Sequence, residues 1–197
     1  MKTLHYYFAL MSPFTFLGHD ELLGIIDGED VQVQFYPLKV GPLFAASGGV
    51  PVGQRAPQRQ AYRLAELRRW SARKEIPLNV QPKHFPVDET LAGCCVLALQ
   101  EQGLSPWDFI GRAHRVVWTE DRDLSDPAIV EELLTASGHD ASATLALARS
   151  ETMLGAYAAC TDAAIEAGVF GAPTYVMDGE LLWGQDRLEF LESMLNG

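Results

Sequence analysis

Two residue types near the N-terminus form a pattern that could support chemistry. Ser12 is followed directly by Pro13, which is typical of a helix start: serine caps the helix and proline takes the first helical position. A hydroxyl in this place can donate a hydrogen bond to an anion such as a thiolate, and the helix dipole adds stabilisation. Ser12 is therefore either an ordinary helix cap or a group that stabilises a bound anion.

A second stretch, residues 168–186, predicts a β-hairpin that leads into a terminal helix. Asp178-Gly179, a dipeptide typical of two-residue turns, separates two short apolar runs. Pro173 precedes the first of these runs, withholds an N–H, and biases Ala172 toward an extended conformation. A trans bond at Pro173 would only mark a strand start, whereas a cis bond would let Ala172 turn its N–H and C=O toward a ligand.

A third stretch concentrates positive charge in an acidic chain. The predicted helix at 58–74 and the loop before it hold seven of the 15 basic residues: Arg55, Arg59, Arg63, Arg68, Arg69, Arg73 and Lys74. Against a net charge of −11, this cluster is either a solvated helix face or a positive field that draws in an anionic small molecule.

The three cysteines do not predict a redox or metal site. Cys94, Cys95 and Cys160 form no CxxC and no metal-ligand spacing, and an odd number is a poor disulfide framework. Cys94 and Cys95 lie in an apolar helical stretch, where a free cysteine is usually a small hydrophobe. We expect no thiol chemistry from these side chains.

The composition excludes several classes of partner. A chain of 197 residues with 48% hydrophobic residues can bury a substantial core and indicates one domain. The net charge of −11 and the pI near 4.8 argue against nucleic acid. No apolar run approaches the roughly 20 residues that span a bilayer, and the N-terminus lacks a signal-peptide pattern. We expect a cytoplasmic protein without a membrane or nucleic-acid partner.

The elements that position these residues form two halves around a helical insertion. A strand at 4–10, a helix from Pro13 to near Gly28 and a strand at 31–38 predict a βαβ unit with a right-handed crossover. Residues 41–57, rich in Gly, Pro and Ala, predict a loop. Start and stop signals predict further helices at about 88–102, 106–119, 126–137, 141–149 and 150–167.

This order of elements resembles the thioredoxin fold, and the large helical insertion is similar to the DsbA-like branch. The expected class is α/β, a thioredoxin-like fold with a large all-helical insertion, in a single domain over 1–197. The two halves would span about 1–40 and 168–197, and the insertion about 55–167. The redox CxxC of that branch falls here on Ser12-Pro13-Phe14-Thr15, so both cysteines are absent and disulfide chemistry is not expected.

The remaining motifs resemble the 2-hydroxychromene-2-carboxylate isomerase family, which is related to kappa-class glutathione transferases. The matching segments are S-P-F-T-F-L at 12–17, R-R-W at 68–70, I-P-L at 76–78, G-V-F-G-A-P-T-Y-V at 168–176 and W-G-Q-D-R at 183–187. The resemblance implies a glutathione-dependent cis-trans isomerase that acts on an aromatic keto acid through reversible thiolate addition. It also implies glutathione as the cofactor, a small aromatic acid as the substrate and a possible homodimer.

The resemblance implies roles for particular residues. Ser12 would stabilise the glutathione thiolate, and Ala172, beside Pro173, would offer backbone hydrogen bonds to the cysteinyl part. The γ-glutamyl end with its ammonium would lie against Trp183, Gly184, Gln185 and Asp186. Asp186 could also cap the terminal helix, and Arg187 could be its structural ion-pair partner.

For the substrate, the resemblance points to Gln54, Arg55 and Phe85. Phe85 could stack on the aromatic ring, and Arg55 could pair with the carboxylate. The acidic residue often found shortly before the serine is absent from residues 8–11, Leu43-Phe44-Ala45 replaces a substrate-binding lysine, and Gln54 replaces an asparagine. These departures concern the natural substrate more than the use of glutathione.

Two other functions remain open. A kappa-like glutathione S-transferase would use the same sulfur site but release a stable adduct. A non-catalytic thioredoxin-fold module would bind partners through the helical insertion and would have no affinity for glutathione.

Overall fold

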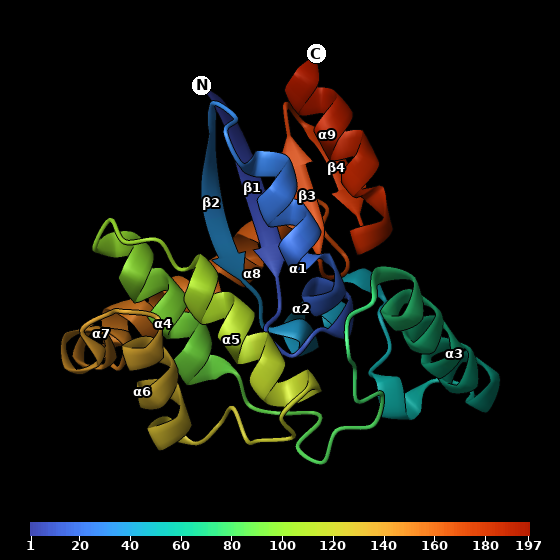
Figure 1. Ribbon diagram of the computed structural model, residues 1–197, viewed down its shortest axis with the longest axis horizontal. Coiled ribbons are helices and arrows are strands. Elements are labelled where there is room, and N and C mark those ends of the chain that lie inside the picture. The colour runs from blue at the N-terminus through green and yellow to red at the C-terminus, as the bar shows by residue number, and fades with distance from the viewer.

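A four-stranded mixed β-sheet organises the fold, which the computed structural model describes over residues 1–197 (Figure 1). The strand order is β2-β1-β3-β4. The strands are β1 (Lys2–Phe8), β2 (Val31–Pro37), β3 (Thr174–Met177) and β4 (Glu180–Trp183). β1 and β2 pair in parallel and are joined by α1 (Pro13–Ile26), whereas β3 pairs antiparallel with both β1 and β4. The carboxyl ends of β1 and β2 therefore meet the amino end of β3 at one edge of the sheet.

Aromatic side chains hold the central strands together. Tyr6 of β1 lies opposite Tyr175 of β3, and their rings stack with centroids 5.5 Å apart. Tyr6 also stacks on Phe8 at 4.7 Å, and all three side chains are almost fully buried. Offset ring pairs of this kind add about 0.5–1.5 kcal/mol beyond their buried area. The aromatic-rich N-terminal sequence is thus a core strand, as predicted.

Helices cover both faces of the sheet. In Figure 1, α1 and α9 (Leu188–Asn196) lie in front of the strands, and α8 (Glu151–Glu166) lies behind them. The short β3–β4 turn is Asp178-Gly179, and both residues have positive φ, as the dipeptide predicts. No helix of the protein is both long enough and apolar enough to cross a membrane.

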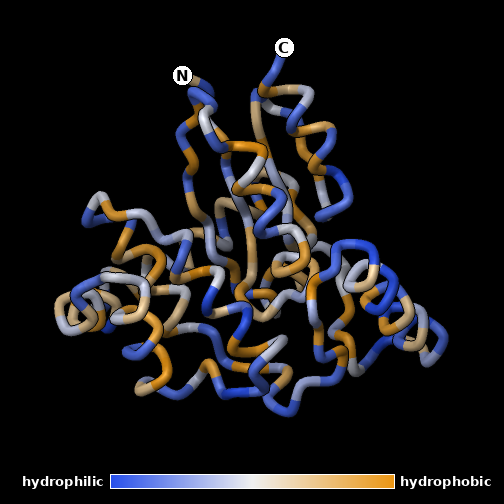
Figure 2. The backbone as a smooth tube through the Cα atoms, in the orientation of Figure 1, coloured by the Kyte–Doolittle hydropathy of each residue, from blue (hydrophilic) through white to orange (hydrophobic).

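Helices also fill the chain between β2 and β3. These are α2 (Val40–Ser47), α3 (Pro57–Lys74), α4 (Thr90–Glu101), α5 (Trp107–Trp118), α6 (Pro127–Ala136) and α7 (Ala141–Ala148), followed by α8. Figure 1 shows α4 to α7 grouped beside one end of the sheet and α3 standing on the opposite side. The buried face of α4 is apolar from Ala92 to Leu99, whereas α3 is largely hydrophilic (Figure 2).

The predicted fold class is confirmed, with two local corrections. Residues 41–57 are not all loop: α2 occupies 40–47, and a 3-10 turn occupies Val52–Gln54. Pro42 lies in the first turn of α2, where a missing N–H costs nothing, and Gly48 ends the helix with a φ of 74°. The first strand ends at Phe8 rather than at residue 10, because a turn closed by the Ser12 N–H and the Ala9 carbonyl follows it.

The three cysteines are buried and free, as predicted. Burial raises the pKa of Cys95 and of Cys160 to about 12, so both thiols are protonated at neutral pH. None of the three lines the cavity described below.

Candidate active site

A cavity of about 400 Å³ opens at the carboxyl-terminal edge of β1 and β2. Its walls come from the start of α1, from α2, from α3 and from the segment before β3. We call it the Ser12 cavity, because Ser12 lines it together with Ala172. Open α/β sheets bind ligands beyond the carboxyl ends of their parallel strands, and the volume is in the usual range of about 300–1,000 Å³ for small-molecule sites.

Ser12 is both a helix cap and a wall of the cavity. Its Oγ accepts a hydrogen bond from the Thr15 N–H at 3.3 Å and donates one to the Ala172 carbonyl, also at 3.3 Å. Both distances are long for a hydroxyl, whose optimum as a donor is about 2.7–2.8 Å. The hydroxyl proton can therefore be redirected to a ligand at small cost, and the two interpretations of Ser12 are compatible.

The segment before β3 brings backbone groups to the same place. The Ala172–Pro173 peptide bond is cis, and the Pro173 carbonyl accepts the Gly184 N–H at 2.9 Å. Ala172 lines the cavity, and its N–H has no hydrogen-bond partner within the chain. A partly buried N–H without a partner is a ready donor for a ligand.

The end of β4 also contributes to the cavity, through Trp183. Trp183 is half exposed and packs edge-on against Phe170, with ring centroids 4.7 Å apart. Its indole nitrogen lies against Gly171, where a Cβ would not fit. Gly184 has a φ of 110°, a value that glycine adopts far more readily than other residues.

Gly184 and the two residues that follow it do not line the cavity. Gln185 is buried, and its side-chain oxygen has no hydrogen-bond partner. Asp186 is exposed and does not cap the terminal helix, since its side chain accepts no backbone N–H there. Its carboxylate lies over Gly184, where a Cβ would be 2.5 Å from Oδ1, and it pairs with Arg187 at 3.4 Å. The predicted ion pair with Arg187 is thus present, and the alternative of a helix cap is wrong.

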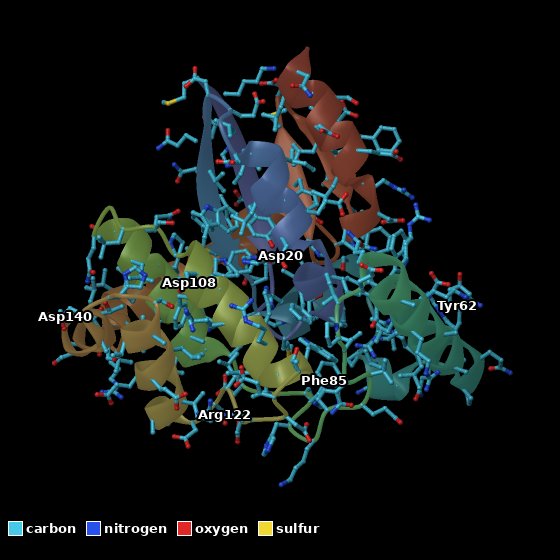
Figure 3. All side chains as sticks on the ribbon, viewed as in Figure 1. Asp20, Tyr62, Phe85, Asp108, Arg122 and Asp140 are labelled. Atoms are coloured by element: carbon cyan, nitrogen blue, oxygen red, sulfur yellow. The ribbon has the colours of Figure 1, made fainter.

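Two of the three predicted substrate residues line the cavity. Arg55 and Phe85 line the cavity, whereas Gln54 is exposed in the 3-10 turn and lies outside it. Figure 3 shows Phe85 on the connection between α3 and α4. One face of its ring is covered by the Arg63 guanidinium, 5.3 Å from the centroid, and the ring also contacts Trp118.

Several cavity residues were not among the predicted site residues. Arg59 and Arg63 line it, together with Phe44 and Phe170. The sequence does indicate the two arginines: they are four residues apart on a predicted helix and so lie on one helix face, and Arg55 lies in the loop just before that helix. Phe44 was not predicted as a site residue, because its helix, α2, was predicted to be a loop.

A buried carboxyl group also lies beside the Ser12 loop. Glu89, which precedes α4, accepts the Met11 N–H on Oε2 at 2.8 Å, and its Oε1 has no partner. Burial raises the pKa of Glu89 to about 8, so it is mostly protonated at neutral pH. Residues 8–11 contain no acid, and Glu89 places a carboxyl group against their backbone from a distant part of the chain.

Gly18 sets the distance between α1 and the segment that carries Asp186. A Cβ at Gly18 would lie 2.8 Å from the Gln185 Cβ, so alanine would push the two segments apart. We expect Gly18→Ala to lower the free energy of unfolding by about 1–3 kcal/mol, measured by urea denaturation. The control is Gly24→Ala in the same helix, which meets nothing within 4 Å and should be neutral or stabilising. Equal effects of the two variants would contradict this packing.

Comparison with known proteins agrees with this fold. The family described as DSBA-like thioredoxin domain matches residues 3–196. The chain therefore belongs to this family, in the branch that contains the 2-hydroxychromene-2-carboxylate isomerases. A 2-hydroxychromene-2-carboxylate isomerase of Pseudomonas sp. (strain C18) is 30% identical over 196 residues, which cover 98% of this chain and 89% of that protein.

Two further relatives also match over nearly the whole chain. A solved 2-hydroxychromene-2-carboxylate isomerase structure superposes with a TM-score of 0.80 at 27% identity and covers 98% of this chain and 94% of that one. The human protein named glutathione S-transferase kappa 1 is 24% identical over 211 residues, which cover 98% of this chain and 91% of that protein.

Proposed function

We propose that this protein is a glutathione-dependent cis-trans isomerase of an aromatic keto acid of the 2-hydroxychromene-2-carboxylate type. The observation that carries the proposal is the Ser12 hydroxyl, which lies at the N-terminus of α1, faces a cavity of about 400 Å³ and adjoins the free N–H of Ala172. The similarity to isomerases over nearly the full chain supports the reaction type.

The residues around the cavity fit a bound glutathione. The N–H and C=O of Ala172 can pair with the backbone of its cysteinyl residue, in the manner of an added strand. The exposed Asp186 carboxylate can accept hydrogen bonds from the γ-glutamyl ammonium. The ammonium would then share this carboxylate with Arg187. These contacts would place the sulfur against Ser12 and the start of α1.

The chain itself supplies no thiol to the cavity, so the reactive sulfur has to come from the cofactor. When bound, glutathione supplies a thiolate that adds reversibly to a conjugated double bond and so permits rotation about it. Ser12 would donate a hydrogen bond from its hydroxyl to the anionic sulfur, and the dipole of α1 would stabilise the same charge. The apolar walls, including Leu43, Phe44 and Phe170, limit the access of water to the reacting atoms.

The contact with Asp186 predicts the effect of its removal. We expect Asp186→Asn to weaken glutathione binding by about 10-fold to 100-fold in calorimetric titration, because a charge-assisted hydrogen bond contributes about 1.5–3 kcal/mol. The matched control is Asp178→Asn, which removes an exposed acid from the β3–β4 turn on the same segment and should leave binding unchanged. Equal affinities of both variants and wild type would remove Asp186 from the glutathione site.

A kappa-like glutathione transferase is the second candidate, favoured by the similarity to the human kappa protein. It would use Ser12 in the same way but release a stable conjugate. Product analysis separates the two: an isomerase returns all glutathione as free thiol after turnover of a hydroxybenzylidene pyruvate, whereas a transferase consumes thiol with a model electrophile. Wild-type protein that binds no glutathione at millimolar concentration would sink both candidates and leave a non-catalytic binding module.

A further inference from the structure

Three arginines line the Ser12 cavity, and no acidic residue does. Arg55 lies in the turn before α3, and Arg59 and Arg63 lie one turn apart on α3 itself. The remaining lining contains no Asp, Glu, Lys or His. The cavity therefore has a strongly positive wall inside a protein whose net charge is −11.

The basic residues of α3 outside the cavity are arranged differently. Arg69 pairs with Glu66, and Lys74 pairs with Glu21 of α1. Arg59 and Arg63, in contrast, make no ion pair and no side-chain hydrogen bond within the chain, and Arg55 only donates its Nε–H to the Val50 carbonyl at 2.7 Å. Two of the four basic residues of α3 outside the cavity thus have acidic partners, whereas neither arginine of α3 in the cavity has one.

Arg63 is the most constrained of the three. It is half buried, and its guanidinium lies over the Phe85 ring, which in turn is fixed against the buried Trp118. Burial, and secondarily the charge of Arg55, lower the pKa of Arg63 to about 10, so it remains charged at neutral pH. A half-buried cation that lies over an aromatic ring can still direct its N–H donors to an anion.

We propose that this wall is a receptor for two carboxylates, with Arg63 on its Phe85 platform holding one and Arg59 the other. Guanidinium groups on successive turns of one helix face are spaced for two separate anions, and each can bind a carboxylate through two parallel N–H donors. Arg55, which is held by its hydrogen bond to the Val50 carbonyl, adds positive electrostatic potential at both carboxylate positions.

Two sources can supply the pair of carboxylates. A single aromatic substrate with two acid groups would occupy both positions, or the keto acid carboxylate would occupy one while the glycyl carboxylate of glutathione occupies the other. The inference rests on the proposed function for the use of these ligands, but binding of carboxylates can be measured without glutathione.

The test is calorimetric titration of benzoate, isophthalate and the neutral benzamide into the protein without glutathione. We expect isophthalate to bind at least about tenfold more tightly than benzoate, and benzamide to bind least, because each charge-assisted pair adds about a factor of ten or more. Arg63→Gln and Arg59→Gln should each remove the preference for isophthalate. Arg68→Gln, which changes an exposed arginine of the same helix outside the cavity, should keep it. Arg63→Lys should restore part of it, since lysine keeps the charge without the planar edge.

A repeat with saturating S-methylglutathione distinguishes the two sources. A preference for isophthalate that persists assigns both carboxylates to one substrate, and a preference that disappears assigns one position to the glycyl carboxylate. Benzoate, isophthalate and benzamide binding alike, or Arg63→Gln behaving like Arg68→Gln, would overturn the receptor. Glutathione binding that still depends on Asp186 would in that case leave the proposed function standing.

Discussion

Ser12→Ala should lower the turnover number of the isomerisation by roughly 10²–10³-fold, while the affinity for glutathione changes little. A single preorganised donor to a developing or stored negative charge contributes about this factor to catalysis. The hydroxyl lies at the α1 N-terminus with only long, replaceable hydrogen bonds, so its loss removes stabilisation from the thiolate and not from the rest of the cofactor. The pKa of bound glutathione, followed by the ultraviolet absorbance of the thiolate, should rise in the variant.

Thr15→Val is the matched control for Ser12→Ala. Thr15 carries the other hydroxyl of the same helical turn, but it is fully buried, its Oγ1 has no partner, and it does not line the cavity. Its replacement should leave turnover and the thiol pKa unchanged. If Ser12→Ala kept full activity, or if Thr15→Val were equally impaired, Ser12 would be a helix cap only, with a cost of about 1 kcal/mol in stability.

Glu89→Gln should change how stability depends on pH. In the folded protein the pKa of Glu89 is raised by burial from the usual 4.5 to about 8. The folded state thus keeps a proton that the unfolded state has lost, so the contribution of this group is fully present below pH 4.5 and is lost as the pH rises to about 8. From this group alone, wild type should lose up to roughly 5 kcal/mol of unfolding free energy across that window, and Glu89→Gln should lose none of it.

Urea denaturation of both proteins from pH 5 to pH 9, at about unit intervals, measures this difference. The gap in unfolding free energy should grow in favour of Glu89→Gln as the pH rises. Asp88→Asn, at the exposed neighbouring acid, controls for the loss of one negative charge before α4 and should not show the same growth. Parallel curves for wild type and Glu89→Gln would mean that Glu89 is ionised in the folded protein throughout.

Two buried histidines predict that stability changes with pH in the opposite direction at acid pH. Burial lowers the pKa of His19 to about 4 and that of His114 to about 3, and the His114 Nδ1–H donates to the Leu10 carbonyl at 2.8 Å. Their contribution is present above the usual value of 6.5 and is lost as the pH falls. The acid limb should therefore be shared by wild type and Glu89→Gln.

The sequence predicts this fold well because its local signals agree with its long-range pairing. Ser12-Pro13 starts a helix, Asp178-Gly179 forms the β3–β4 turn, and the aromatic run in β1 is buried at the centre of the sheet. The exception is α2, where Gly, Pro and Ala content favoured a loop although Pro42 in a first turn is compatible with a helix.

The site is less predictable, because its members are brought together only by the fold. The helix-start pattern indicated Ser12, and the family resemblance added Ala172 and Trp183; all three line one cavity. The sequence alone could not show that Glu89 reaches the backbone of Met11, 78 residues earlier in the chain. Nor could it separate the arginines of α3 that line the cavity from Arg69, which pairs with Glu66, and Lys74, which pairs with Glu21, since that division depends on how α3 sits against α1.

The most direct test of the account is a crystal structure of the protein with bound glutathione. We predict that the sulfur lies within hydrogen-bond distance of Ser12 Oγ, that the cysteinyl backbone pairs with Ala172, and that the γ-glutamyl ammonium meets the Asp186 carboxylate. Glutathione bound elsewhere, or bound in the cavity with its sulfur directed away from Ser12, would contradict the proposed reaction.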